Sequence, residues 1–190
     1  MPPVSPERTE SSRRRRVDPE RRDRIARAAL DVIAERGVEA LTHRAVAEAA
    51  DVPLGSTTYH FADREELLLA ALEEALAADR ELLAAWAREL PAEPDLPRAL
   101  TDLILATTAE ERQKSVVGFE IFAAAVRHPD LRPAADVWAN LLPEALAPYV
   151  DEVTALALSV TVEALLLRIL LETRPRDRET IEAILRRVLA

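Results

Sequence analysis

The chain has 190 residues, with 25 Lys and Arg against 34 Asp and Glu, and therefore a formal net charge of −9. Its 49% apolar and 31% charged residues are typical of a soluble globular protein and exclude a chain that is disordered throughout. Three Gly and 4% aromatic residues disfavour a β-sandwich or barrel, and the lack of Cys excludes disulfide and thiolate chemistry. We expect an all-α, cytoplasmic protein that neither enters a membrane nor is secreted, because Glu163 and Arg168 interrupt the longest apolar stretch.

Charge is distributed unevenly along the chain. Residues 1–63 contain eleven arginines and eleven acidic residues, so the whole net charge of −9 falls on 64–190. Residues 1–17 mix Pro, Ser, Glu and Arg without apolar periodicity, which predicts a disordered arm. Four consecutive arginines lie in this arm: Arg13, Arg14, Arg15 and Arg16. A block of arginine at one end of an acidic chain indicates an anionic partner there.

Three helices are predicted within residues 18–63. Apolar residues recur at helical spacing up to Gly37, which suits a C-cap. Thr42 can cap a second, short helix over 43–50. A proline then interrupts the chain, because proline disfavours helix at the residue before it, and a third helix follows over 54–60.

The third helix is almost entirely polar between its two expected apolar anchors, Leu54 and Phe61. A short helix, a tight turn and a polar helix form a helix-turn-helix, in which the second helix of the pair lies in the major groove. The free N–H groups beside Gly55 and Ser56 can bind a phosphate, and the hydroxyl, phenol and imidazole groups that follow can reach phosphates and base edges. The sequence therefore predicts double-stranded DNA as a partner.

Residues 64–190 are predicted to be helical and broken by prolines. Asp63 and Glu66 form a capping box that opens a helix to about Leu90, a rod of about 40 Å. The helix over 153–172 is apolar on almost every side, so it must be covered on both sides. A second copy of the chain is the natural cover, which predicts a homodimer through the two C-terminal helices.

The run THRAVAEAADVPLGSTTYHF over 42–61, followed by DREEL over 63–67, resembles the tetracycline-repressor (TetR) family of transcriptional regulators. The resemblance extends over residues 18 to about 70; beyond that only length, helicity and the proline breaks are similar. It implies a DNA-binding domain over 18–63 and a helical ligand-binding and dimerisation domain over 64–190. It also implies DNA contacts from Thr42, His43, Arg44, Leu54, Gly55, Ser56, Thr57, Thr58, Tyr59, His60 and Arg64.

Two points about these contacts stay open. The family more often has a large aliphatic residue at the position of Thr57 and a tyrosine at that of Thr58, so which of Thr57, Thr58 and Tyr59 reads a base is undecided. The arginines at 13–16 are also candidate contacts, because such an arm can follow a minor groove, although a solvated tail is the alternative.

The resemblance also implies a cavity for a small-molecule effector, which we expect to be apolar or amphipathic. Candidate lining residues on the helices of the second domain are Trp86, Thr107, Phe119, Glu120, Phe122, Trp138, Asn140 and Glu163; each could instead belong to the core. His43 and His60 have no companions at metal-ligand spacing, so neither a metal nor another cofactor is predicted.

These features together predict a homodimeric repressor that binds a palindromic operator and is released when a ligand tilts the long helix. A ligand-independent activator, or a protein that pairs with another regulator, is an alternative. A helical-bundle enzyme is disfavoured, because the sequence has no Glu-x-x-His pair, no Gly-Lys phosphate loop and no Cys.

Overall fold

The computed structural model describes residues 20–110, 112–172 and 176–190, and every regular element in them is a helix. Two elements are short 3-10 helices, η1 (Val38–Ala40) and η2 (Pro129–Leu131). The α-helices are α1 (Arg21–Arg36), α2 (His43–Ala49), α3 (Leu54–His60), α4 (Arg64–Glu89), α5 (Leu96–Glu110), α6 (Arg112–Ala125), α7 (Arg132–Leu146), α8 (Glu152–Leu171) and α9 (Arg178–Leu189). The all-α prediction is confirmed, whereas the predicted arm over 1–17, with Arg13 to Arg16, lies outside the described residues.

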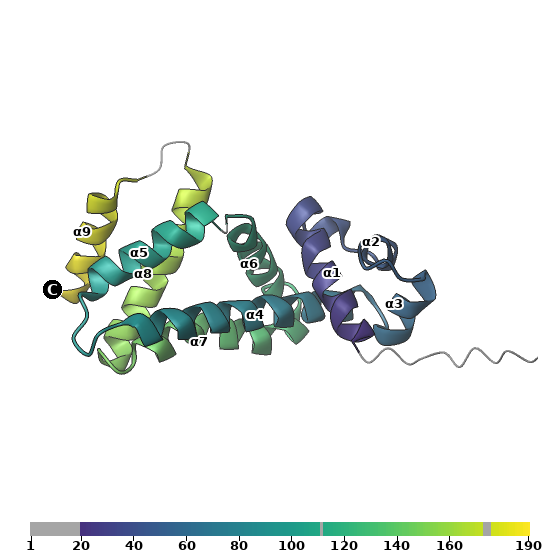
Figure 1. Cartoon of the computed structure of the whole chain (residues 1–190), viewed down its shortest axis with the longest axis horizontal. Helices are drawn as coiled ribbons and strands as arrows, with labels where there is room; N and C mark the ends of the chain where they lie inside the picture. Colours follow the sequence, from purple (N-terminus) through teal and green to yellow (C-terminus); the bar gives the residue numbers. More distant parts are fainter. Residues whose placement is uncertain (1–19, 111, 173–175) are drawn as a thin grey trace, which may run out of the picture.

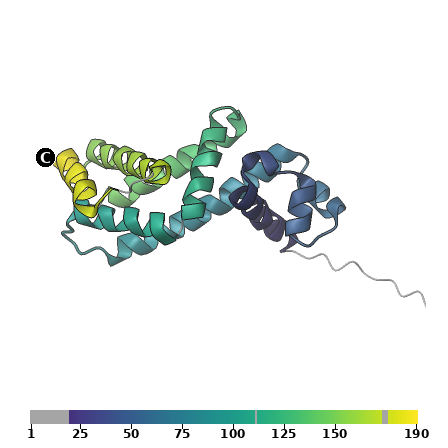
Figure 2. The same ribbon diagram turned by 90° about the horizontal axis from the view of Figure 1, so that it is seen from above.

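The molecule is elongated, with α1, α2 and α3 at one end and α9 at the other (Figure 1). The long helix α4 runs from the first three helices along α7 toward the far end, where α5, α8 and α9 lie. The view turned by 90° shows the same separation of the two ends, with α4 reaching from one into the other (Figure 2). A displacement of α4 would therefore act on both ends of the molecule.

Helix boundaries follow from local caps that the sequence predicts. Gly37 ends α1 with φ of 79°, a conformation that favours glycine. The hydroxyl of Thr42 accepts the N–H of Ala45 at 3.1 Å and caps α2. The carboxylate of Asp63 accepts the N–H of Glu66 at 2.9 Å and caps α4. These bonds fix the start of the long helix immediately after α3.

Two hydrophobic cores hold the chain together. The first joins α1, α2 and the N-terminal part of α4, and it also includes Val117 and Ile121 of α6 and Ala135 of α7. The second joins α5, α8 and α9 with the end of α7. Because the first core includes Val117 and Ile121, α1 is packed directly on α6, and α4 contacts both α6 and α7.

Among the described helices, α8 alone is long and apolar enough to cross a membrane. Buried core helices of soluble proteins meet the same criteria of length and composition. On one side, Leu158, Val162 and Leu165 are buried in the second core. On the other side, a row of large apolar side chains is exposed: Val153 (76%), Leu156, Val160, Leu167 and Leu171 (74%). The helix is thus covered on one side only within this chain.

Candidate DNA interface and ligand pocket

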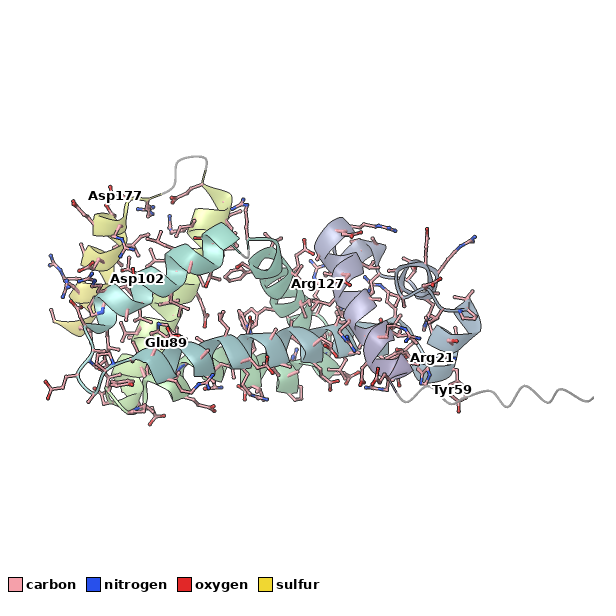
Figure 3. All side chains as sticks on the ribbon, in the orientation of Figure 1. Arg21, Tyr59, Glu89, Asp102, Arg127 and Asp177 are labelled. Carbon is pink, nitrogen blue, oxygen red and sulfur yellow. The ribbon has the colours of Figure 1, made fainter. Side chains whose placement is uncertain are left out.

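The exposed surface of α3 is the candidate DNA interface. Tyr59 is 83% exposed, and Figure 3 shows it at the outer edge of the first three helices, at the opposite end of the molecule from Asp102 and Asp177. Thr58 is exposed beside it, and His60 packs edge-on against the Tyr59 ring with centroids 5.1 Å apart. The aromatic and hydroxyl groups of the predicted recognition helix are therefore available to a ligand outside the chain.

The first turn of α3 is also open. Gly55 has no atom within 4 Å of the position that a Cβ would occupy, so another molecule can approach its backbone closely. Leu54 is half-exposed, whereas Phe61 is fully buried against the first core. The prediction that Leu54 anchors α3 in the protein is wrong; as an exposed side chain it remains a candidate for contact with DNA.

Thr57 is the second anchor of α3, and this corrects its placement among the DNA contacts. Its side chain is 0% exposed, and its hydroxyl donates to the carbonyl of Leu54 at 2.8 Å. A second, longer contact joins the hydroxyl to the carbonyl of His43 in α2 at 3.4 Å. A side chain without exposed surface cannot touch a base or a phosphate, so Thr57 fixes α3 to α2, and the choice of base reader narrows to Thr58 and Tyr59.

Arg64 has an internal role beside its predicted one. Its guanidinium donates to the carbonyl of Leu41 at 3.1 Å and to that of Val38 at 2.8 Å, and so ties the start of α4 to η1. Of the remaining predicted contacts, Thr42 and Arg44 are exposed and His43 and Ser56 are half-buried. Apart from the buried Thr57, the described candidate contacts are the N-cap Thr42 and residues of α2, α3 and the start of α4.

A cavity of about 120 Å³ lies between α4, α5, α6, α7 and α8. Its walls are mostly aliphatic, and four of the predicted ligand-binding residues line it: Thr107, Phe119, Trp138 and Glu163. Ligand sites for drug-sized molecules are usually about 300–1,000 Å³. The cavity as it stands is therefore too small for such a ligand, and its walls must separate to admit one.

Trp138 joins three of the helices around this cavity. Its indole N–H donates to a carboxylate oxygen of Asp79 in α4 at 2.6 Å. Its rings pack edge-on against Phe119 and at a tilt against Phe122, both in α6, with centroids 6.2 and 5.1 Å apart. These contacts couple the positions of α4, α6 and α7 to the contents of the cavity.

Glu163 brings a half-buried carboxyl group into the same cavity from α8. One carboxylate oxygen accepts the hydroxyl of Ser159 at 3.2 Å. Burial raises the pKa of the Glu163 carboxyl, and the Ser159 hydrogen bond opposes this only in part. Glu163 therefore places a carboxyl group that is partly withdrawn from water on the wall of the cavity.

The other four predicted ligand residues do not line this cavity. Trp86 packs on the second core, and the exposed Asn140 donates to the carbonyl of Asp136 at 2.7 Å. Phe122 packs against Trp138 and is not among the lining residues. Glu120 faces away from the cavity toward η1, where its carboxylate accepts the N–H of Val38 at 3.1 Å. These four do not line the cavity as it stands, because helix periodicity does not tell which neighbour each polar face meets.

Asp79 is a lining residue that the sequence analysis missed. It occupies a place in the apolar stripe of α4 between Leu76 and Leu83, at helical spacing from both. A carboxylate at a stripe position is a signal that the residue faces an interior site. In the described part of the chain, no group of three or more His, Cys, Asp or Glu side chains could hold a metal ion.

Comparison with known proteins covers both ends of the chain. Residues 25–71 match the family model described as bacterial regulatory proteins, tetR family, and residues 94–190 match the tetracyclin repressor-like, C-terminal domain. The chain is 30% identical to the HTH-type transcriptional regulator BetI of Burkholderia thailandensis over 162 residues, which are 79% of this chain and 82% of BetI.

Solved structures show the same fold. The multidrug binding protein EbrR complexed with ethidium is 39% identical, with a TM-score of 0.82, and the match covers 90% of this chain and 99% of EbrR. A TetR-family protein from Streptomyces coelicolor A3 is also 39% identical, with a TM-score of 0.79 and coverage of 90% and 98%. The similarity therefore extends over both the candidate DNA interface and the ligand pocket.

Proposed function

Because the chain belongs to the TetR family of bacterial transcriptional regulators, which are DNA-binding proteins and not enzymes, we propose that it is a homodimeric repressor that a small molecule releases from its operator. The observation that carries this proposal is the pairing of an outward-facing polar helix, α3, with an interior cavity, joined by the long helix α4.

DNA binding is proposed to use the exposed face of α3, with Tyr59 and Thr58 at base edges or phosphates and Arg44 at the phosphate backbone. Arg13 to Arg16, outside the described residues, are proposed to add affinity that falls with salt concentration, because each phosphate contact releases counterions. The palindromic operator follows from the proposed dimer, which presents two copies of α3 to two half-sites.

The proposed dimer interface is the exposed apolar row of α8. Val153, Leu156, Val160 and Leu167 follow one another at helical spacing along this face. In α9 the large apolar side chains Ile181 and Leu185 are fully buried in the second core of the same chain, so α8 supplies the apolar part of the proposed interface. Burial of such a row against a second copy removes a large apolar patch from water.

Release is proposed to begin when the ligand enlarges the cavity. Since about 120 Å³ does not hold a drug-sized molecule, a ligand must push apart helices that include α4 and α8. The first core and the Asp79–Trp138 hydrogen bond connect α4, α6 and α7 to the DNA-binding end, so this movement changes the position of α3 relative to its copy. The ligand shifts the equilibrium only to the extent that it binds the enlarged state better.

Selection of bound fragments from random-sequence DNA, with the full-length purified protein at stated salt, tests the proposal. We expect a palindromic motif with two half-sites, and release of the selected fragment by at least one amphipathic compound. A folded protein that enriches no motif would contradict sequence-specific DNA binding, and a motif that no ligand releases would favour a ligand-independent regulator.

A further inference from the structure

The start of α1 is rich in arginine. Its first two turns contain Arg21, Arg22, Arg24 and Arg27, beside a single acidic residue, Asp23. Figure 3 shows Arg21 at the same end of the molecule as Tyr59, the most exposed residue of the candidate DNA interface. None of these arginines is among the DNA contacts that the sequence predicts. An excess of positive charge therefore lies next to that interface, on a helix outside the helix-turn-helix pair.

Arg22 is positioned by an aromatic ring. The carbon of its guanidinium lies over the Phe61 ring, 5.0 Å from the centroid. Phe61 directly follows α3 and is 1% exposed, whereas Arg22 is an exposed residue. Such a contact between a cation and an aromatic ring is attractive and orders the long arginine side chain. The Arg22 side chain is thus packed on a buried ring at the end of α3 while part of it stays in contact with water.

The guanidinium of Arg22 keeps its capacity for hydrogen bonds. Among the described residues, no oxygen accepts a hydrogen bond from it and no acidic side chain forms an ion pair with it. The two carboxylates that follow Phe61 bind backbone instead: Asp63 accepts the N–H of Glu66 at 2.9 Å, and Glu66 accepts the N–H of Ala62 at 2.6 Å. A guanidinium carries N–H donors in a planar fork that matches the oxygens of a phosphate.

The location of this group points to the DNA backbone as its partner. Phe61 is two residues beyond Tyr59, which is at most about 7 Å along the chain. Each strand of a duplex carries a phosphate about every 3.4 Å of helix axis, so a duplex on α3 brings phosphates close to Arg22. The nearby guanidinium of Arg64 is engaged by the carbonyls of Val38 and Leu41. Arg22 is therefore the better placed of the two for a phosphate.

We propose that Arg22 binds a phosphate of the DNA backbone beside the C-terminal end of α3, and that α1 is thereby a third helix of the DNA interface. This rests on the proposed function, in which α3 lies on operator DNA. Because Phe61 already restricts the Arg22 side chain, less conformational entropy is lost when the phosphate binds. A phosphate contact carries no sequence information, so Arg22 contributes position and affinity while residues of α3 contact base edges.

The test measures binding of the full-length protein to the selected operator and to a random duplex of equal length, over a range of salt concentrations. Arg22→Met removes the charge and keeps an apolar side chain over Phe61. Arg22→Lys keeps the charge but loses the planar fork. The matched control is Arg80→Gln, which removes one positive charge from an exposed site about 24 Å along α4 from its first residue.

We expect Arg22→Met to weaken binding to both duplexes about three- to ten-fold, and to lower the slope of log K against log salt by about 0.9 for each copy of Arg22 on DNA. Arg22→Lys should retain the slope, and Arg80→Gln should retain both affinity and slope, because salt screens a distant charge. An unchanged slope in Arg22→Met would show that Arg22 only covers Phe61 and would overturn the proposal. Weaker binding to the operator alone would overturn it too, because that is the effect expected of a base contact.

A second measurement covers an Arg22→Met variant that does not fold. Phosphates of the operator are replaced one at a time by uncharged methylphosphonate. At one position in each half-site we expect the replacement to weaken binding by the parent protein at least two-fold more than binding by Arg22→Lys, which cannot form the two-pronged contact. Equal effects on both proteins at every position would overturn the proposal.

The outcomes separate this contact from the function on which it rests. A parent protein that selects an operator with an affinity independent of Arg22 would overturn the proposed contact alone. A parent protein that binds neither duplex would overturn the repressor function together with the contact.

Discussion

Both ends of the molecule bury an apolar core, but they differ in where their functional polar groups and their exposed apolar groups lie. At the DNA-binding end the apolar residues of α1, α2 and α4 are buried, and the polar groups of α3, with Tyr59 the most exposed, face outward. At the other end, carboxylates of α4 and α8 face an interior cavity while a row of large apolar side chains on α8 faces outward. An outward polar face suits a ligand larger than the protein, and an inward one suits a small ligand.

The two ends also differ in how far their side chains are covered by the described part of the chain. At the DNA-binding end α3 is anchored within the chain, because Phe61 and Thr57 are buried. The far end exposes a row of large apolar side chains on α8, which needs a cover from outside the chain. The proposal of a second copy of the chain follows from this exposed row, and the experiments below test it together with the other differences between the two ends.

The largest effect is expected at the apolar row of α8. Leu156→Glu combined with Val160→Glu should convert a dimer to a monomer at micromolar concentration, because each unpaired charge buried in an interface costs about 3–5 kcal/mol. Sedimentation velocity measures the outcome. The control is Val126→Glu, at a 72% exposed apolar residue outside α8, which should leave the dimer intact. A dimer that survives the double substitution would place the interface elsewhere.

At the other end, Tyr59 and the neighbouring buried Thr57 should behave differently. Tyr59→Ala should weaken operator binding by about 1–3 kcal/mol, since an exposed contact to a base or phosphate is lost. Thr57→Val keeps the volume but loses the bond to Leu54, so it should lower the free energy of unfolding by about 1 kcal/mol while the folded protein binds the operator normally. Operator titrations and chemical denaturation measure the two effects. If Thr57→Val weakened operator binding as much as Tyr59→Ala does, Thr57 would have to contact DNA.

The contact between the two ends offers a test of how they communicate. Glu120 of α6 accepts the N–H of Val38 beside the helices that bind DNA. Glu120→Ala should reduce the coupling between ligand and operator binding by about 0.5–1.5 kcal/mol and leave ligand affinity without DNA unchanged. Glu120→Gln keeps an acceptor oxygen and should retain most of the coupling. If the Ala variant is released from DNA as readily as the parent protein, the connection runs through α4 alone.

The smallest effect concerns the cost of Glu163 to stability. Burial raises the pKa of the Glu163 carboxyl in the folded protein. At pH below the ordinary pKa of 4.5 the group is protonated in both the folded and the unfolded state, so it does not lower the free energy of unfolding. That free energy falls as pH rises through the raised pKa. Asp79 on α4 is the other described titratable lining group, and Glu163→Gln leaves it in place. We expect this variant to be more stable than the parent protein at pH 7 by less than about 1 kcal/mol, because the group is only half-buried, with no difference at acid pH. Thermal unfolding at both pH values measures this, and a destabilised variant at pH 7 would contradict an uncompensated charge.

Much of the DNA-binding end could be predicted from sequence because its signals are local. Gly37, Thr42 and Asp63 cap the predicted helices with hydrogen bonds to residues three or four positions away. The polar run of α3 likewise predicts an exposed helix from its own composition. Thr57 is the exception, since its burial depends on the packing of α3 against α2, which composition does not reveal.

The ligand pocket was predicted less well because it depends on contacts between distant segments. Asp79 and Trp138 are 59 positions apart, and Glu120 and Val38 are 82 apart. Phe119 and Glu120 are neighbours in α6, yet one lines the cavity and the other bonds to η1. Adjacent residues on a helix face directions about 100° apart, so only the position of the neighbouring helices decides what each side chain meets.

The sequence alone thus determined the all-helical architecture, the helix-turn-helix and the long helix after it, because caps, prolines and apolar periodicity act over a few residues. The tertiary structure decided that Thr57 is buried, that Asp79 and Glu163 share one cavity, and that one face of α8 remains uncovered. These features depend on how helices far apart in the chain pack together, and packing is settled by the summed burial of many side chains rather than by any one segment.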